Sequence, residues 1–304
     1  MLAYETSAQD TQDSDVAWLE RRVGSYIGLT YRVVRHLASG GMAHVFLVER
    51  EPCGTCAAVK VSDQPCGVPD AVLREEGALL SRIDHPNIVP LLERGTTYDG
   101  SDYLLLEYAK GVELDEWLRW SGNSVSHARL LHVLRQLAAA LDYLHSQHIV
   151  HGDVKPGNVM VDAHAGDHVT LVDFGLAFRE GRVRERRDYG TPGYLAPEQL
   201  RRERCGPAID RFALAALALE LFSARGLLSR ARLRQLSEQG KQHADAIPYL
   251  PSLALRQLFA RALSDKPEER FASAREFVGA LESESESVLI RSARVHSGYG
   301  LPHL

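Results

Sequence analysis

The sequence lacks an apolar run long enough to cross a membrane. A spanning helix needs about 18 or more consecutive apolar residues, and the longest apolar stretch, Phe212–Phe222 (FALAALALELF), is shorter and contains Glu220. We expect this stretch to be a buried core helix, and we expect no membrane span. Residues 1–15 have no basic start and no apolar run, which argues against a secretory signal. Position 2 is Leu, which does not fit the N-myristoylation pattern. The expected location is cytoplasmic.

The chain also lacks a basic excess. It has 35 Lys and Arg against 40 Asp and Glu in 304 residues, a net charge of −5. This balance argues against a nucleic-acid partner held by a global basic field. It leaves anionic small ligands open, because local groups can bind them. Hydrophobic residues make up 45% and charged residues 25%, as in ordinary globular proteins, and the length allows one large domain or two lobes.

Cysteine is scarce, with only Cys53, Cys56, Cys66 and Cys205. The spacing Cys53-Gly-Thr-Cys56 fits either a redox pair or half a zinc site. It also fits a tight turn, EPCGTC, between two strands. No second pair with ligand spacing follows, which favours the turn.

The N-terminal third alternates strand-like segments with turns. Residues 31–37, 44–50 and 55–62 predict strands, and the short turns between them indicate an antiparallel start rather than a parallel crossover. A helix that opens at Pro69 and Asp70 follows. Strand-like segments at 87–95 and 102–109 come next.

The helix predicted from Pro69 to Ile83 carries a carboxylate on its apolar side. Val72, Leu79, Leu80 and Ile83 form the expected stripe, and Glu76 is four residues after Val72, so it falls on the same inward face. A buried carboxylate needs a partner.

From Leu114 onward the pattern is mostly helical. In residues 127–145 leucines recur at helical spacing, and Ser126 is a plausible N-cap. A polar turn, His151–Asn158 (HGDVKPGN), then precedes short strands at 159–161 and 169–172. An irregular stretch runs to Glu198, and the remainder to about Leu281 is predicted to be helical.

Several motifs occur in a fixed order: AAVK (57–60), HPNIV (85–89), LLLEYAKG (104–111), HGDVKPGN (151–158), DFG (173–175) and GTPGYLAPE (190–198). Each is weak alone, but in this order and spacing they resemble a eukaryotic-type (Hanks-type) Ser/Thr protein kinase, as found in many bacteria. The resemblance implies an α+β bilobal kinase fold with a small antiparallel-sheet N-lobe and a larger, mostly helical C-lobe. The implied parts are a partly disordered leader (1–28), the kinase domain (29–281: N-lobe 29–107, hinge 107–110, C-lobe 111–281) and a mobile tail (282–304).

The implied activity is transfer of the γ-phosphoryl group of ATP to Ser or Thr hydroxyls of proteins, with Mg²⁺ as cofactor and Mn²⁺ able to replace it. Such a reaction needs positioning and charge neutralisation more than covalent chemistry. By resemblance, Lys60 holds the α- and β-phosphates and pairs with Glu76. This pairing would supply the partner that the carboxylate of the predicted helix needs.

The HGDVKPGN turn and the DFG motif would supply the remaining polar groups. By resemblance, Asp153 orients the substrate hydroxyl and accepts its proton, and Lys155 offsets charge on the transferring group. Asn158 and Asp173 would bind magnesium. Thr191 would bond Asp153 and Lys155 and help to select hydroxyl substrates.

The resemblance also implies a nucleotide pocket and two structural contacts. Glu198 would pair with Arg270, and Asp210 would brace the catalytic loop. The glycine loop contributes Gly40 and Gly41. The expected adenine contacts are the side chains of Leu37, Val45, Ala58, Leu106 (the gatekeeper) and Met160, and the backbone of Glu107 and Ala109.

The chain departs from the family pattern in two places. In the glycine loop only Gly40 keeps its place, with Gly41 added beside it, and Ala38 and Ala43 replace the outer glycines, which puts the strength of nucleotide binding in question. Gly152 replaces the arginine that normally binds an activation-loop phosphate, and between Asp173 and Gly190 there is no Ser or Thr. We therefore hypothesise that activity needs no activation-loop phosphorylation. The five arginines of this stretch favour either acidic substrates or a solvated charged loop.

Two other functions compete with the protein kinase. The HGD form also occurs in aminoglycoside- and choline-kinase-like enzymes, but those lack the GTPGYLAPE segment and the Phe-Gly after the metal aspartate. A pseudokinase scaffold is favoured by the altered glycine loop. It is opposed by the presence of Lys60, Glu76, Asp153, Asn158 and Asp173.

Overall fold

The computed structural model of the chain describes residues 26–27, 31–40, 43–62, 68–97, 100–121, 125–181, 191–223, 250 and 252–284. The chain divides into two compact units, Met1–Lys110 and Gly111–Leu304. No helix in these described ranges is both long enough and apolar enough to cross a membrane.

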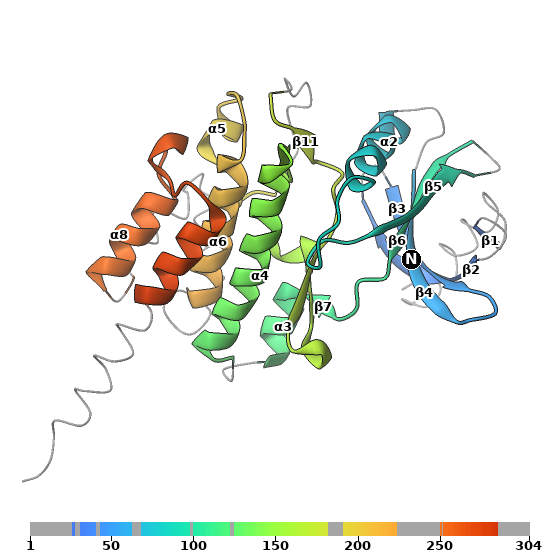
Figure 1. Cartoon of the computed structure of the whole chain (residues 1–304), viewed down its shortest axis with the longest axis horizontal. Coiled ribbons are helices and arrows are strands. Elements are labelled where there is room, and N and C mark those ends of the chain that lie inside the picture. Colours follow the sequence, from blue (N-terminus) through green and yellow to red (C-terminus); the bar gives the residue numbers. More distant parts are fainter. Residues whose placement is uncertain are drawn as a thin grey trace, which may run out of the picture. The chain divides into compact units, whose positions relative to one another are not determined.

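The first unit is built on a six-stranded antiparallel sheet with the strand order β1-β2-β3-β4-β6-β5 (Figure 1). Strands β2, β3 and β4 pair in sequence through short turns, as the sequence predicted, whereas β4 next pairs with β6, and β5 lies at the edge beyond β6. The strands are β1 (Tyr26–Ile27), β2 (Tyr31–Ser39), β3 (Ala43–Arg50), β4 (Thr55–Ser62), β5 (Leu91–Thr96) and β6 (Asp102–Glu107).

The register divides this sheet into two faces. Phe46 lies opposite Val59, and Val59 lies opposite Leu105, so these side chains share one face and form part of its buried core. Val45 lies opposite Lys60, and Lys60 lies opposite Leu104, so these residues share the other face. Because side chains alternate along a strand, the register alone assigns Lys60 to the face opposite the Phe46 core.

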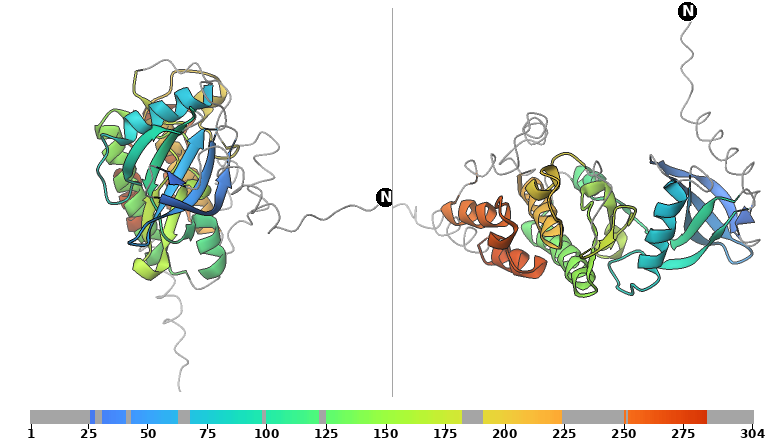
Figure 2. Two further views of the ribbon diagram at one scale, coloured as in Figure 1. Left: turned by 90° about the vertical axis from the view of Figure 1, so that its right-hand side faces the viewer. Right: turned by 90° about the horizontal axis from the view of Figure 1, so that it is seen from above.

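Helix α2 (Val68–Leu80) lies against one face of the sheet (Figure 2). Its contact with Leu104, which lies opposite Lys60, identifies this as the Lys60 face. A Cβ added to Gly77 would lie 2.6 Å from Leu104 Cδ2, so the helix backbone runs directly against β6 at this point. The predicted stripe was partly wrong. Leu73, which the sequence analysis left out, is buried, whereas the helix ends at Leu80 and Ile83 lies in the following turn.

The second unit is mainly helical. Ser126 accepts a hydrogen bond from the N–H of Arg129, as expected for the cap of α4. The stretch predicted as a buried core helix is α6, and most of its side chains are inaccessible. Helices α4 and α6 run side by side, and α8 lies against α6 (Figure 1). The helices are α3 (Leu114–Ser121), α4 (His127–Ser146), α5 (Pro197–Leu200), α6 (Ala208–Ser223), α8 (Leu253–Ala262) and a helical segment at 274–284.

Short strands and 3₁₀ turns frame the polar loop of this unit. β9 (Val159–Asp162) lies between β7 (Val112–Glu113) and β10 (His168–Leu171), and β8 (Ile149–Val150) pairs with β11 (Phe178–Arg179). The 3₁₀ turns are η2 (Pro156–Asn158), η3 (Ala163–Ala165) and η5 (Pro267–Glu269). Gly111 precedes β7 with φ of 97°, and a Cβ there would lie 2.1 Å from the carbonyl oxygen of Val161, so only glycine fits.

The architecture confirms the expected α+β class, with an antiparallel sheet and one main helix followed by a mostly helical unit. Two details differ. Tyr26 and Ile27, placed in the leader, pair with β2, and the two-residue strands β7, β8 and β11 were not predicted.

Some expectations lie outside the described residues. They concern most of the leader, the tail from 285 onward, Gly41 and Met42, Cys66, Tyr189 and the arginines between 182 and 187. In the described part, Cys53 and Cys56 are free and exposed. Cys53 lies in the turn between β3 and β4, where Gly54 donates its N–H to the Arg50 carbonyl, and Cys56 is the second residue of β4. This geometry agrees with the turn interpretation of EPCGTC.

Candidate active site

Lys60 and Glu76 form an ion pair within the first unit. The Lys60 Nζ lies 2.9 Å from Oε1 and 2.8 Å from Oε2 of Glu76. The side chains are 13% and 1% exposed, so the pair is largely shielded from water and interacts more strongly than a surface pair. The partner that the sequence demanded for the Glu76 carboxylate is therefore present.

Three expected adenine contacts lie on the same face as Lys60. Ala58 lies opposite Leu106 and two residues before Lys60, while Val45 lies directly opposite Lys60. Val45 and Ala58 are half-buried, whereas Leu106 is 8% exposed. The face therefore offers small apolar side chains beside the cation.

The remaining predicted nucleotide contacts lie in a bulge, in a turn, or in and beyond other strands. Leu37 lies in a bulge of β2, and Gly40 donates its N–H to the Ala43 carbonyl in the next turn. Glu107 is the last residue of β6, and Ala109 lies at the end of the first unit. Met160 lies in β9, opposite Thr170. Their roles at a nucleotide stay predictions.

In the second unit the HGDVKPGN turn gathers three polar side chains. The Lys155 Nζ lies 2.7 Å from Asp153 Oδ2. The Asn158 amide nitrogen donates to Asp153 twice, to the backbone oxygen at 2.8 Å and to Oδ2 at 3.0 Å. The cation and the amide together fix the orientation of the Asp153 carboxylate. Because the amide nitrogen of Asn158 faces Asp153, the amide oxygen of Asn158 is the atom suited to bind a cation.

Asp173 is connected to this turn through the backbone. Val172 donates its N–H to the Asn158 carbonyl at 2.9 Å, at the end of the β9–β10 ladder. Asp173 itself has a positive φ of 61°, and its Oδ1 accepts the Gly175 N–H at 3.3 Å. A non-glycine residue in this conformation is uncommon and often marks a functional position.

His151 links the two segments, a role that the sequence analysis missed. The backbone nitrogen of Asp153 lies 3.3 Å from His151 Nδ1, so Nδ1 accepts this hydrogen bond. In a neutral ring the proton is then on Nε2, which lies 3.2 Å from the Val172 carbonyl oxygen and can donate to it. The His151 ring also packs edge-on against the Phe174 ring, with the two ring centroids 4.8 Å apart. The only available signal was the place of this histidine inside the HGD motif.

Asp210, at the start of α6, binds the backbone of the HGDVKPGN turn. Its carboxylate accepts the N–H groups of His151 at 2.9 Å and Gly152 at 2.8 Å, and His145 Nε2 lies at 2.9 Å. Burial alone would raise the pKa of Asp210, but the hydrogen bond and charge of His145, with the other donors, hold it below its usual value. The expected contact of Asp210 with the HGDVKPGN turn is confirmed.

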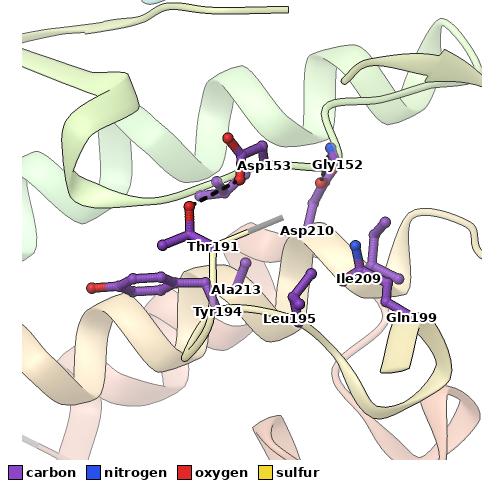
Figure 3. A pocket seen from close by; sticks show the side chains of 10 residues that line it. Gly152, Asp153, Thr191, Tyr194, Leu195, Gln199, Ile209, Asp210 and Ala213 are labelled. Carbon is purple, nitrogen blue, oxygen red and sulfur yellow. Dashed lines mark hydrogen bonds between the residues drawn. The ribbon is translucent and has the colours of Figure 1, made fainter. Parts of the chain in front are cut away.

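Thr191 and the residues after it line a pocket beside Asp153 (Figure 3). The Thr191 hydroxyl lies 3.5 Å from Asp153 Oδ1, a long hydrogen bond. Its expected bond to Lys155 stays a prediction. Tyr194 donates its hydroxyl proton to Glu220 of α6, which ties this segment to the core helix.

Glu198 and Arg270 form the second expected structural pair. The Arg270 Nη1 and Nη2 atoms each lie 2.7 Å from a carboxylate oxygen of Glu198, in a bidentate arrangement. Both side chains are almost fully buried, at 2% and 1% exposed. The pair attaches α5 to the C-terminal part of the unit.

The donor set of this unit suits a hard divalent cation. Mg²⁺ prefers carboxylate, carbonyl and water oxygens and is usually held by one or two carboxylates together with substrate phosphates. The Asp173 carboxylate and the Asn158 amide oxygen are of this chemistry. The residues present therefore fit the cofactor that the resemblance implies.

The comparisons with known proteins agree with this geometry. Residues 31–280 match the model of the protein kinase domain family, and the chain belongs to that family. It is 30% identical over 285 residues to the serine/threonine-protein kinase Pkn1 of Myxococcus xanthus, covering 88% of this chain and 40% of that protein. It is 31% identical over 280 residues to PknH of Mycobacterium bovis, covering 87% of this chain and 44% of that protein.

Solved structures give the same fold. The crystal structure of the Mycobacterium tuberculosis PknI kinase domain matches with a TM-score of 0.63 and 26% identity, over 85% of this chain and 98% of that one. A double mutant of the same domain matches with a TM-score of 0.64 and 25% identity, over 84% and 96%. The fold is thus that of protein kinases, and the chain spans about half or less of the length of the curated relatives it matches.

Proposed function

We propose that the protein is a Mg²⁺–ATP-dependent kinase that transfers the γ-phosphoryl group to serine or threonine hydroxyls of proteins. The network in which Asp153 holds both Lys155 and Asn158 carries this proposal. The serine/threonine-protein kinase names of its relatives support the same chemistry. The natural protein substrates are of unknown identity.

Each side chain would have a distinct task. Lys60 would hold the α- and β-phosphates, and Glu76 keeps its ammonium group oriented. Asp153 would position the acceptor hydroxyl and take its proton, while Lys155, already 2.7 Å from that carboxylate, would offset charge on the transferring group. Thr191 would help to align the acceptor.

Asn158 and Asp173 would hold the magnesium ion. When bound, the ion neutralises phosphate charge that would otherwise repel the incoming oxygen. Asn158 is already oriented by its two bonds to Asp153, so its amide oxygen does not need to reorganise on binding. The face of Ala58, Val45 and Leu106 would receive the adenine.

The test is phosphate transfer from Mg²⁺–ATP to a generic protein acceptor by wild type and Asp153→Ala. Loss of the general base should lower the rate by a factor on the order of 10²–10⁴. Asp162→Asn is the matched control, because the Asp162 side chain caps a local turn by accepting the N–H of His164. It should leave the rate unchanged.

The outcomes separate the competing functions. Nucleotide binding with no transfer by the wild type would favour a pseudokinase, for which the alanines of the glycine loop are the motivating feature. Transfer to a small aminoalcohol or aminoglycoside but not to protein would favour the small-molecule kinases. Asp173→Ala should abolish metal-dependent nucleotide binding; unchanged Mg²⁺–ATP affinity would count against its metal role.

We further propose that activity does not need a phosphorylated activation loop. Gly152 has no side chain with which to bind a phosphate, and its position is fixed instead by its N–H bond to Asp210. Mass spectrometry of active protein tests this proposal. A phosphate on Thr191 or Tyr189 that is obligatory for turnover would refute it.

A further inference from the structure

Two imidazole rings and one hydroxyl meet at the turn end of the β2–β3 hairpin. The Ser39 Oγ lies 2.8 Å from His36 Nε2 and 2.8 Å from His44 Nδ1. One nitrogen of each ring is therefore directed at the same point. The two ring centroids are 6.2 Å apart, with the planes tilted by 54°.

The sheet fixes this arrangement. Ser39 lies opposite His44, and His36 lies opposite Phe46, so the three polar side chains share the face of the Phe46 core. Both rings pack against the fully buried Phe46, with centroid separations of 5.1 Å for His36 and 6.3 Å for His44. The rings are held on a rigid support, as a binding site requires.

We propose that His36 and His44 form a binding site for a divalent transition-metal ion of the zinc type. Imidazole nitrogen is a preferred ligand of Zn²⁺, Ni²⁺ and Cu²⁺. The ion would take over the bridging role of the Ser39 hydroxyl, bound by His36 Nε2 and His44 Nδ1. Metal–nitrogen bonds of about 2.0–2.1 Å are shorter than the present contacts to oxygen, so the two rings approach each other by side-chain rotation.

This site has two protein ligands and leaves the other coordination positions of the ion open. The described part of the chain contains no group of three or more His, Cys, Asp and Glu side chains suited to a metal ion. The remaining coordination positions are taken by water. The ion joins the end of β2 to the start of β3 and so restrains the turn in which Gly40 donates to Ala43. The site does not depend on the proposed kinase activity.

The experiment is calorimetric titration of the full chain with zinc chloride, and with nickel chloride as an analogue, in metal-free buffer without nucleotide. His36→Asn and His44→Asn should each weaken one binding event at least about tenfold, since even outer-shell losses cost about 10–100-fold. The double variant should bind one equivalent fewer than wild type. Ser39→Ala should retain the site, because the hydroxyl competes with the ion for both rings.

His164→Asn is the matched control, since His164 is an exposed histidine on η3. It should bind as wild type does, which excludes a general effect of losing one of the 13 histidines. Equal stoichiometry and affinity in wild type and the double variant would overturn the proposal. NMR of the imidazole groups in wild type gives a second measurement that needs no variant: zinc should shift the His36 and His44 resonances, and unshifted resonances at saturating zinc would also overturn it.

Discussion

Replacing Asp210 by Asn should both destabilise the protein and impair its catalytic loop. The Asp210 carboxylate is 1% exposed and accepts the backbone N–H groups of His151 and Gly152 on different oxygens. Asparagine has one acceptor oxygen, so its amide nitrogen must face at least one of these donors. A buried N–H without an acceptor costs about 1–3 kcal/mol, and loss of the charge from the remaining bonds adds about 1 kcal/mol.

The expected total is about 2–4 kcal/mol. A loss of about 3 kcal/mol lowers Tm by roughly 6–12 °C in a domain of this size. Urea unfolding at neutral pH measures the free energy, and phosphate transfer at a temperature where both proteins are folded measures the loop. We expect both to fall in Asp210→Asn.

Asp142→Asn is the matched control. Asp142 also accepts two backbone N–H groups, from Ala274 at 2.8 Å and Arg275 at 3.0 Å, but it serves the C-terminal helix rather than the catalytic loop. It should lower stability and leave the transfer rate per folded molecule unchanged. Wild-type stability and transfer in Asp210→Asn would refute the reasoning.

The difference in stability between wild type and Asp210→Asn should depend on pH with a defined sign. The pKa of Asp210 is lowered in the folded protein, because the bonds and charge from His145 and the other donors outweigh burial. Its stabilising contribution is therefore present above the ordinary aspartate pKa and is lost as the pH falls through the lowered folded value. The stability gap between wild type and Asp210→Asn should hold at neutral pH and shrink below about pH 4.

Further substitutions test other contacts. Lys60→Met should cost about 3–5 kcal/mol in urea unfolding, because Glu76 stays buried after losing the cation that contacts it; adding Glu76→Leu should recover most of this loss. Gly77→Ala should weaken the proposed ATP binding by shifting α2 relative to β6, and adding Leu104→Ala, which removes the 2.6 Å contact with Leu104 Cδ2, should restore it. Arg211→Met should leave the unfolding free energy unchanged or raise it. In the described part of the chain the Arg211 Nε is buried without a hydrogen-bond partner, and burial lowers the pKa of this guanidinium.

The sequence predicts well where a periodic pattern or a local rule is decisive. Strands β3 and β4 alternate between buried and more exposed residues, Ser126 stands where a helix needs a cap, and the buried carboxylate of Glu76 demanded a cation. The motif order supplied the contact between Glu198 and Arg270, which are far apart in the chain. These features depend on residue types at fixed spacing.

Contacts that depend on tertiary placement could not be predicted in this way. His145 ends an ordinary amphipathic helix, and nothing in its neighbourhood shows that it meets Asp210, which lies 65 residues later. His151 acts through both ring nitrogens on two separate segments. The strands β8 and β11 have two residues each, too few for an alternating pattern to be visible.

Each of the two sets of polar groups has contacts within one unit. The Lys60–Glu76 pair involves only residues of Met1–Lys110, and the contacts around Asp153 involve only residues of Gly111–Leu304. A double variant with one substitution in each set tests in unfolding measurements whether the two sets are energetically independent. In catalysis, where both sets would act on one nucleotide, the effects of the two substitutions should not add. Comparing the two kinds of measurement on a single double variant would separate contributions to the stability of each unit from contributions to a reaction that needs both units.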